Sequence, residues 1–202
     1  MTEVTAAMVK QLREATGAGM MACKKALQDA EGDMTRAATI LREKGLASAA
    51  GRASRSADQG LIDSYIHFNN TVGVLVEVNS ETDFVANTDG FRTLVKDIAL
   101  HIASPASPSW VTREEVPDSL LDSERHIFEV QAKESGKPDE VIAKIVKGKL
   151  ESFYKDHVLL DQPFVKDDSK TIQQLLDETS ARVGEKVAVR RFVRYKLGEG
   201  AG

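Results

Sequence analysis

The first fifty residues carry apolar side chains at helical spacing, in three short runs. The runs are Val4–Ala15, Cys23–Ala30 and Ala37–Leu41, and glycines at 17, 32 and 45 follow them as stop signals. Helices this short cannot bury enough apolar surface alone, so we expect them to pack as a three-helix bundle. The segment 46–60, rich in Ala, Ser and Gly, is typical of a linker that is helical in part. We place a helical domain at 1–50 and a linker at 51–60.

Beyond residue 60 the pattern changes to the alternation of half-buried strands. Leu61–Phe68 and Thr71–Asn79 predict a hairpin around the turn Asn69-Asn70, and Lys186–Leu197 predicts a closing strand. Helical patterns lie between them, at 91–102, from 120 to near Gly136, from Pro138 to Tyr154, and from 172 to near Gly184. Helices and antiparallel strands without a regular strand–helix repeat indicate an α+β fold. We expect an antiparallel-sheet core packed with helices at 61–197 and a frayed tail at 198–202.

The join between the second strand and the next helix is the most informative stretch. Glu77–Asn87 is filled with short polar side chains, except that Phe84 stands beside Asp83. An aromatic ring at such a turn either folds back into the core or is held out for a partner. The residue pattern alone leaves both readings open.

Composition narrows the class of protein. The chain has 202 residues, a formal net charge of −4 and a single cysteine, Cys23, so it cannot form an intrachain disulfide. We expect a protein of the reducing cytoplasm, without a membrane span or export signal. The acidic balance argues against a dedicated nucleic-acid binder, although arginines on the last strand leave a basic patch possible.

No residue constellation indicates catalysis or metal binding. The acids Glu77, Glu81, Asp83 and Asp89 do not have the spacing of a calcium loop, and capping or a solvated surface explains them better. The histidines at 67, 101, 126 and 157 lack ligand spacing. We therefore expect no resident metal, no cofactor and no catalytic residue. A metal-dependent hydrolase built on Glu77, Glu81 and Asp83 is the weakest alternative.

The segment Thr16–Met21 resembles a phosphate loop only superficially. It lacks the Lys-Ser/Thr ending and a preceding strand. Met20 and Met21 are adaptable apolar side chains that suit a binding surface, but a plain turn with one Met in the core has equal weight. By residue chemistry, the chain is a binding or regulatory protein, and a helical adaptor for a peptide or ubiquitin-like surface is the main alternative.

Two stretches resemble the signatures of one family, bacterial translation elongation factor Ts. They are Leu12–Met21, continued by Cys23–Leu27, and Glu77–Asn87, centred on Thr82-Asp83-Phe84-Val85. Gln162–Val165 and the closing strand also fit, and the likeness runs to about Leu197. One departure is Ala22, where the family usually has Asp, which removes a charge at a helix start. The chain is similar to the short, single-core form of the family.

The resemblance implies a guanine-nucleotide exchange factor, not an enzyme, for the GTPase elongation factor Tu. The first domain would then be ubiquitin-associated-like and would dock on the GTPase domain through Arg13, Met20 and Met21. Thr82, Asp83, Phe84 and Val85 would press towards the bound magnesium, with Phe84 as a wedge and Asp83 rearranging groups around the ion. Val183 and Gly184 match a further contact segment.

The resemblance also implies partners and assembly. The factor would bind the GDP form of elongation factor Tu, dislodge Mg²⁺, promote GDP release and leave when GTP rebinds. A single-core form would replace the missing second half with another copy, which gives a homodimer and a 2:2 complex. Direct nucleic-acid or membrane binding is not expected.

Overall fold

A computed structural model describes residues 4–52, 54–134 and 138–199. Its contacts divide the chain into two compact units. The first unit comprises Met1–Leu61, Asn79–Phe91 and Gln174–Ala188, and the second comprises Ile62–Val78, Arg92–Gln173 and Val189–Gly202. The chain therefore crosses between the units several times, and each unit is described by itself.

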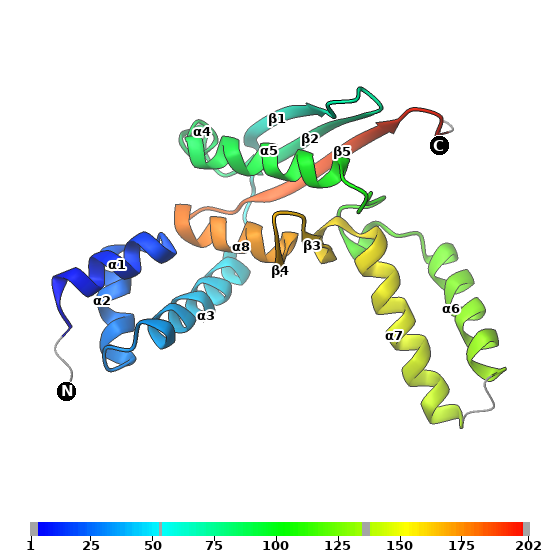
Figure 1. Ribbon diagram of the computed structural model, residues 1–202, viewed down its shortest axis with the longest axis horizontal. Helices are drawn as coiled ribbons and strands as arrows, with labels where there is room; N and C mark the ends of the chain where they lie inside the picture. The colour runs from blue at the N-terminus through cyan, green and yellow to red at the C-terminus, as the bar shows by residue number, and fades with distance from the viewer. Residues whose placement is uncertain (1–3, 53, 135–137, 200–202) are drawn as a thin grey trace. The chain divides into compact units, whose positions relative to one another are not determined.

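Three helices open the first unit (Figure 1): α1 at Ala6–Thr16, α2 at Met20–Asp29 and α3 at Met34–Arg52. They contact one another pairwise around a small core formed by Val9, Leu12, Cys23, Ala26, Leu27, Ala30 and Ala37. The predicted three-helix bundle is thus confirmed.

The end predicted for the third helix is wrong, because α3 continues through Gly45 to Arg52. A Cβ atom at Gly45 would lie 3.2 Å from the Cβ of Ala181. The glycine therefore marks a close approach to a neighbouring helix and does not act as a stop signal.

The second unit is built on an antiparallel sheet. The strands β1 (Gln59–Ile66), β2 (Val72–Ser80) and β5 (Ala188–Lys196) are ordered β1-β2-β5. The N–H of His67 donates to Val72 O at 2.9 Å, and the N–H of Leu197 donates to Thr71 O at 2.8 Å. Both neighbours of β2 therefore run antiparallel to it. The predicted hairpin and closing strand are confirmed, and the fold is α+β.

One face of this sheet is buried and the other is exposed. Val74, Val76 and Val78 point to the buried face, and the amphipathic helix α5 (Asp89–Ala103) runs alongside the sheet (Figure 1). The opposite face carries exposed apolar side chains, namely Ile62, Ile66, Leu75, Val193 and Tyr195. We call these five residues the outer sheet face. Contacts on this face show how the strands are aligned. Ile66 of β1 lies opposite Gly73 of β2, where its Cδ1 would be 3.0 Å from an added Cβ, and Glu77 of β2 pairs with Arg191 of β5 at 2.7 Å.

The remaining elements of the second unit are mostly helical. The helices α6 (Asp118–Lys133) and α7 (Asp139–His157) lie side by side as a hairpin, around Ala132, Ile142 and Val146 (Figure 1). The short elements are η1 (Arg113–Glu115), η2 (Leu159–Asp161), β3 (Pro163–Phe164) and β4 (Asp167–Thr171). The last two form an antiparallel pair that the sequence pattern did not predict.

The last helix, α8 (Ile172–Val183), ends where its stop signal predicted, just before Gly184. The short helix α4 (Asp83–Ala86) fills the join in which only a turn was expected. Two sequence predictions, the helix end near Gly136 and the tail residues 200–202, lie outside the described residues. Within the described part of the chain, no helix is both long and apolar enough to cross a membrane.

Candidate functional site

The turn between α1 and α2 is made by two glycines with different conformations. Gly17 adopts a left-handed φ of 68° and its N–H donates to Arg13 O at 2.7 Å, which closes α1. Gly19 is extended and precedes the first residue of α2. A Cβ at Gly17 would lie 2.9 Å from Nε of Arg182. The turn therefore passes directly beside the last turn of α8, within the same unit.

This turn exposes three side chains together. Met20 and Met21 open α2 and are 58% and 76% exposed, whereas Cys23 and Leu27 further along the helix are fully buried. Arg13, in the last turn of α1, is also exposed. The alternative in which one methionine fills the core is therefore wrong. We call Arg13, Met20 and Met21 the α1–α2 surface.

The start of α2 also shows the consequence of Ala22. The described helix has no acidic residue in its first turn and no side-chain cap at Gly19. Ala22 is exposed. A short acidic side chain in this turn would face the positive end of the helix dipole, and this chain lacks that interaction.

The four residues Thr82–Val85 at the start of α4 differ in exposure and in their contacts. Thr82 is the N-cap, and its Oγ1 accepts a long hydrogen bond of 3.5 Å from the N–H of Val85. Asp83 is exposed in the first turn, and Val85 is buried. Phe84 is 83% exposed. The ring is therefore held out from the protein and does not fold back into the core.

A glutamate distant in sequence holds this turn. Glu185 accepts the N–H of Thr82 at 3.0 Å and the hydroxyl of Thr82 at 2.6 Å. The carbonyl of Glu185 in turn accepts the hydroxyl of Ser180, on α8. Sequence reasoning missed Glu185, because no local pattern signals a partner 103 positions away.

A second glutamate, Glu81, makes the same type of contact in the opposite direction, from the α4 turn to the segment after α8. Glu81 accepts the N–H of Lys186 at 2.6 Å and pairs with Arg55 at 3.3 Å. The hydrogen bond from Lys186 is the main reason that the pKa of Glu81 lies below its ordinary value, and the nearby positive charge of Arg55 acts in the same direction.

The end of α8 supplies the remaining candidate contact. Gly184 is exposed, has a left-handed φ of 79°, and its N–H donates to Ser180 O at 2.9 Å. Val183 before it is half-buried. The first unit thus contains all the sequence-predicted site residues, and Gly184 directly precedes the glutamate that holds the α4 turn.

Comparison with known proteins identifies the family. The family model described as Elongation factor TS matches residues 2–199. The chain belongs to the elongation factor Ts family.

Individual relatives agree closely with this match. The chain is 55% identical to Elongation factor Ts of Acetivibrio thermocellus over 98% of this chain and 91% of the relative. It is also 55% identical to Elongation factor Ts of Coprothermobacter proteolyticus, over 98% of this chain and the whole relative. For Elongation factor Ts of Desulforamulus reducens the identity is again 55%, over 99% of this chain and 92% of the relative. The chain is thus a translation elongation factor at the level of its family.

The acidic residues of this elongation factor Ts chain do not converge on a metal site. Glu77 pairs with Arg191, Glu81 with Lys186 and Arg55, and Asp83 lies in the first turn of α4. Among the residues that the structure describes, no group of three or more His, Cys, Asp and Glu side chains could hold a metal ion. The histidines at 67, 101, 126 and 157, all of them within the described ranges, belong to no such group.

His101 has a structural role in the second unit. It is fully buried, its Nε2 lies 2.9 Å from Gln162 Oε1, and its Nδ1 accepts the N–H of Val165 at 3.2 Å. These contacts fit a neutral ring with the proton on Nε2. Burial lowers the pKa of His101 below 6.5, although the contact with Gln162 opposes the shift.

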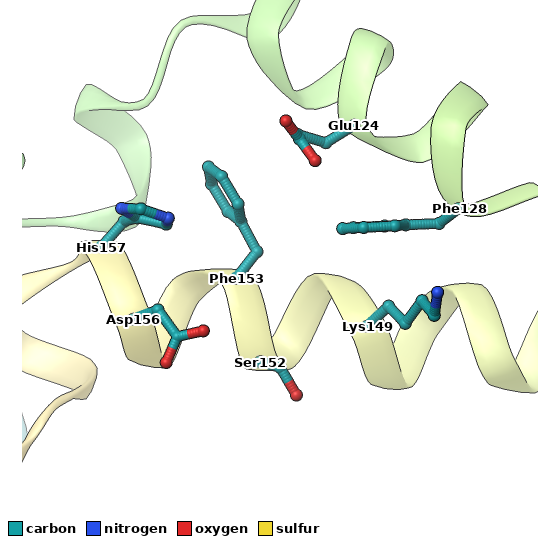
Figure 2. Close-up of a pocket in the computed structure, with 7 residues that line it drawn as sticks. All are labelled: Glu124, Phe128, Lys149, Ser152, Phe153, Asp156 and His157. Carbon is teal, nitrogen blue, oxygen red and sulfur yellow. The ribbon is translucent and has the colours of Figure 1, made fainter. Parts of the chain in front are cut away.

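A shallow pocket of about 370 Å³ lies between α6 and α7 (Figure 2). The rings of Phe153 and His157 lie against each other at a tilt of 43° and a centroid distance of 4.6 Å, and Lys149 lies 5.3 Å from the ring of Phe128. The lining includes a serine and a histidine, but the hydroxyl of Ser152 donates to Gly148 O at 3.2 Å and points away from His157, so the two do not form a nucleophile–base pair (Figure 2). The pocket therefore gives no sign of catalysis.

Proposed function

We propose that the chain is a guanine-nucleotide exchange factor for elongation factor Tu. It binds the GDP form, dislodges the bound Mg²⁺, and promotes release of GDP and rebinding of GTP during translation elongation. Membership of the elongation factor Ts family supports this proposal, and the exposed Phe84 on its fixed turn is the observation that carries it. The chain breaks no covalent bond in this process and is therefore not an enzyme.

The α4 turn supplies the element that acts on the partner's metal site. Phe84 presents an apolar wedge, and Asp83 beside it presents a negative charge. Magnesium requires nearly ideal octahedral geometry, so a small displacement of its ligands weakens its binding sharply. A wedge that moves those ligands loosens the ion, and GDP loses one of its anchors. Thr82 and Val85 support the wedge, one as the cap and the other as its buried root.

The other candidate residues provide docking. The α1–α2 surface binds the GTPase domain through two flexible methionines and one arginine, side chains that are typical of interface anchors. Val183 and Gly184 add a contact at the end of α8. The 2.9 Å approach of a Gly17 Cβ to Arg182 places the α1–α2 turn beside that end and supports one continuous docking surface.

Thermodynamic coupling explains why the exchange factor is released. If the exchange factor lowers the affinity of elongation factor Tu for GDP by a given factor, GDP lowers the affinity of elongation factor Tu for the exchange factor by the same factor. The chain therefore binds the nucleotide-free partner most tightly. It leaves when GTP and Mg²⁺ rebind and close the site that Phe84 occupied.

We also propose a homodimer that forms a 2:2 complex with elongation factor Tu. The outer sheet face supports it, because its apolar side chains lie together on all three strands. Glu77 and Arg191 at its side pair with each other at 2.7 Å, which lowers the cost of covering these two charges with a second copy. A two-fold axis through such a face is the commonest way in which soluble chains associate.

The same proposal assigns the parts of the chain and its location. Residues 1–50 form a ubiquitin-associated-like docking domain, 51–60 a linker, and 61–197 the core and dimerisation domain. The protein acts in the cytoplasm, where its partner works, and binds neither nucleic acid nor membrane directly.

Release of mant-GDP from elongation factor Tu tests the function. The chain should accelerate release, and Phe84→Ala should reduce the accelerated rate by about thirtyfold or more, since truncation of an aromatic anchor costs about 2 kcal/mol or more. Ile127→Ala is the control, because Ile127 is an exposed apolar side chain on α6 that belongs to neither proposed contact surface. Unchanged release with the wild-type chain would refute the function, and full activity of Phe84→Ala would refute the wedge.

A further inference from the structure

Two glutamates connect the α4 turn to the end of α8 in a reciprocal manner. Glu81 accepts the backbone N–H of Lys186, and Glu185 accepts the backbone N–H of Thr82. Each carboxylate therefore binds the residue that follows the other carboxylate. We call this pair of contacts the glutamate clamp.

We propose that Glu185 is a positioning residue for nucleotide exchange, which holds Phe84 in the orientation that the partner meets. This inference rests on the proposed function, since it assigns a further residue to the same site. It also makes the α4 turn and the segment Val183–Gly184 a single rigid surface, because the glutamate clamp connects them.

The need for such a clamp follows from the length of α4. The helix has only four residues, and a helix of this length is not stable by itself in water. At its C-terminal end, side chains of Asn87 and Thr88 donate to the carbonyls of Asp83 and Val85 at 2.9 and 2.8 Å. At its N-terminal end, the N–H of Val85 donates to Thr82 Oγ1 over 3.5 Å, which is a weak cap. The end of the turn that precedes Phe84 therefore depends on contacts from outside the helix.

Glu185 provides this constraint through the capping residue itself. The hydroxyl of Thr82 donates its proton to Glu185 Oε1 at 2.6 Å. This contact leaves the lone pairs of Thr82 Oγ1 directed towards the N–H of Val85. Hydrogen bonds to a carboxylate are stronger than those between neutral groups. One side chain thus fixes both the backbone and the cap of the turn that carries Phe84.

The glutamate itself is held at its backbone. Its carbonyl accepts the hydroxyl of Ser180, and the N–H of Gly184 before it donates to the carbonyl of Ser180 at 2.9 Å. Glu81 secures the next residue by its bond to Lys186, and the Nζ of Lys186 donates to Arg55 O at 2.9 Å. The carboxylate of Glu185 therefore projects from a fixed point.

A double-mutant cycle tests the proposal against a merely structural role. Mant-GDP release from elongation factor Tu is measured over a range of chain concentrations for Glu185→Ala, Phe84→Ala and the double variant. Glu185→Ala should lower the maximum rate by about tenfold, a difference of about 1.4 kcal/mol, and leave the half-saturating concentration nearly unchanged because the α1–α2 surface is intact. Added to Phe84→Ala, it should have no further effect, since the residue acts through Phe84.

Conservative variants complete the test. Glu185→Gln retains the side-chain size and one acceptor, so it should recover part of the rate; it also carries the test if Glu185→Ala does not fold. Glu43→Ala, which removes an exposed carboxylate from α3, should behave as the wild type. A full maximum rate for both Glu185 variants, or multiplicative losses in the double variant, would overturn the proposal.

A measurement without the partner separates this proposal from the proposed function. In Glu185→Ala, the amides of Thr82 and Val85 should exchange with solvent about tenfold faster, whereas the amide of Leu27 in the helical bundle should not change. If the wild-type chain fails to accelerate GDP release, the function is wrong, and these amides still report whether Glu185 holds the turn. Unchanged exchange at both amides would remove the clamp.

Discussion

Phe84 and Phe68 are almost equally exposed, at 83% and 86%, but they differ in what surrounds them. Phe84 stands on a turn that is connected to a distant segment of the chain by two glutamates. Glu185 accepts hydrogen bonds from Thr82, and Glu81 accepts one from Lys186. Phe68 follows β1 at a hairpin turn, where its ring lies tilted against that of its neighbour His67 at 4.4 Å. Two nearly equal exposed fractions therefore accompany different structural support, and this difference separates the two phenylalanines.

The surroundings of the two rings also indicate different kinds of contact. Phe84 is an exposed apolar side chain on a turn where Asp83 and Asn87 are also exposed, which suits a partner that binds and leaves. Phe68 comes two residues after Ile66, at the edge of the outer sheet face, which suits a more persistent contact between identical chains. The two regions can be tested separately, because each contact predicts a different defect.

The largest expected effect contrasts Phe84 with a phenylalanine seven residues further on. Phe91 is fully buried, so Phe91→Ala should lower the free energy of unfolding by about 3–5 kcal/mol. Phe84→Ala should change it by about 0.5 kcal/mol or less, because the ring has little to lose on exposure. Urea denaturation measures both. A large loss of stability in Phe84→Ala would show that its ring is part of the core.

An intermediate effect is expected for self-association through the outer sheet face. Leu75 lies on the central strand and is 47% exposed, and Leu75→Asp would place an unpaired charge in the middle of a two-fold interface. The variant should weaken the dimer by about a hundredfold, which corresponds to about 2.7 kcal/mol. Light scattering over a concentration series measures this change.

Phe84→Ala is the control for that experiment, because it should leave the dimer intact. A wild-type chain that remains monomeric at every concentration would remove the homodimer. A Leu75→Asp chain that dimerises normally would place the contact on another surface.

The smallest effect concerns stability at low pH. The contributions of His101, in the second unit, and of Glu81, beside the α4 turn, should be lost over different pH ranges. The folded pKa of His101 lies below 6.5, so the unfolded chain takes up the proton first and stability should fall as the pH drops below about 6.5. The folded pKa of Glu81 lies below 4.5, so the stability it contributes is present above that pH and is lost only as the pH falls further.

Unfolding measured at pH 7, 6 and 5 tests this order. The loss should be reduced in His101→Asn, which keeps a polar side chain in the buried site but does not titrate. The protection factor of the Lys186 amide, which corrects for the intrinsic pH dependence of exchange, should not change over this range, since Glu81, which accepts this N–H, remains ionised. Opening of the α4 turn between pH 7 and 6 would contradict the assignment.

The sequence predicted the regular elements well, because their signals are local. Apolar spacing located the helical bundle and the hairpin, and Asn69-Asn70 indicated the turn, in which Asn70 has a left-handed φ of 56°. Single glycines were less reliable as signals for the end of a helix. Gly184 ends a helix, whereas Gly45 lies inside one and makes room for Ala181. Local sequence cannot distinguish these cases, since the neighbour of Gly45 lies more than a hundred positions away.

The candidate site was predictable only in part for the same reason. The unusual juxtaposition of Asp83 and Phe84 drew attention to the turn, and the resemblance to a family favoured its presentation to a partner. The contacts that hold the turn involve Glu185, a residue that looks like any surface glutamate in the sequence. The short pair of β3 and β4 was missed because its residues, such as Asp167–Thr171, are polar and lack the alternation of a half-buried strand.

The 103-residue separation between Thr82 and Glu185 also has a consequence for biosynthesis. A chain emerges from the ribosome with its amino-terminal end first, so the α4 turn is made long before the residue that holds it. Contacts so distant in sequence form late in folding, because a long loop must close before they stabilise anything. A nascent or prematurely ended chain would therefore carry Phe84 without fixing its direction. The proposed exchange activity would therefore reach its full rate only when synthesis has passed residue 185.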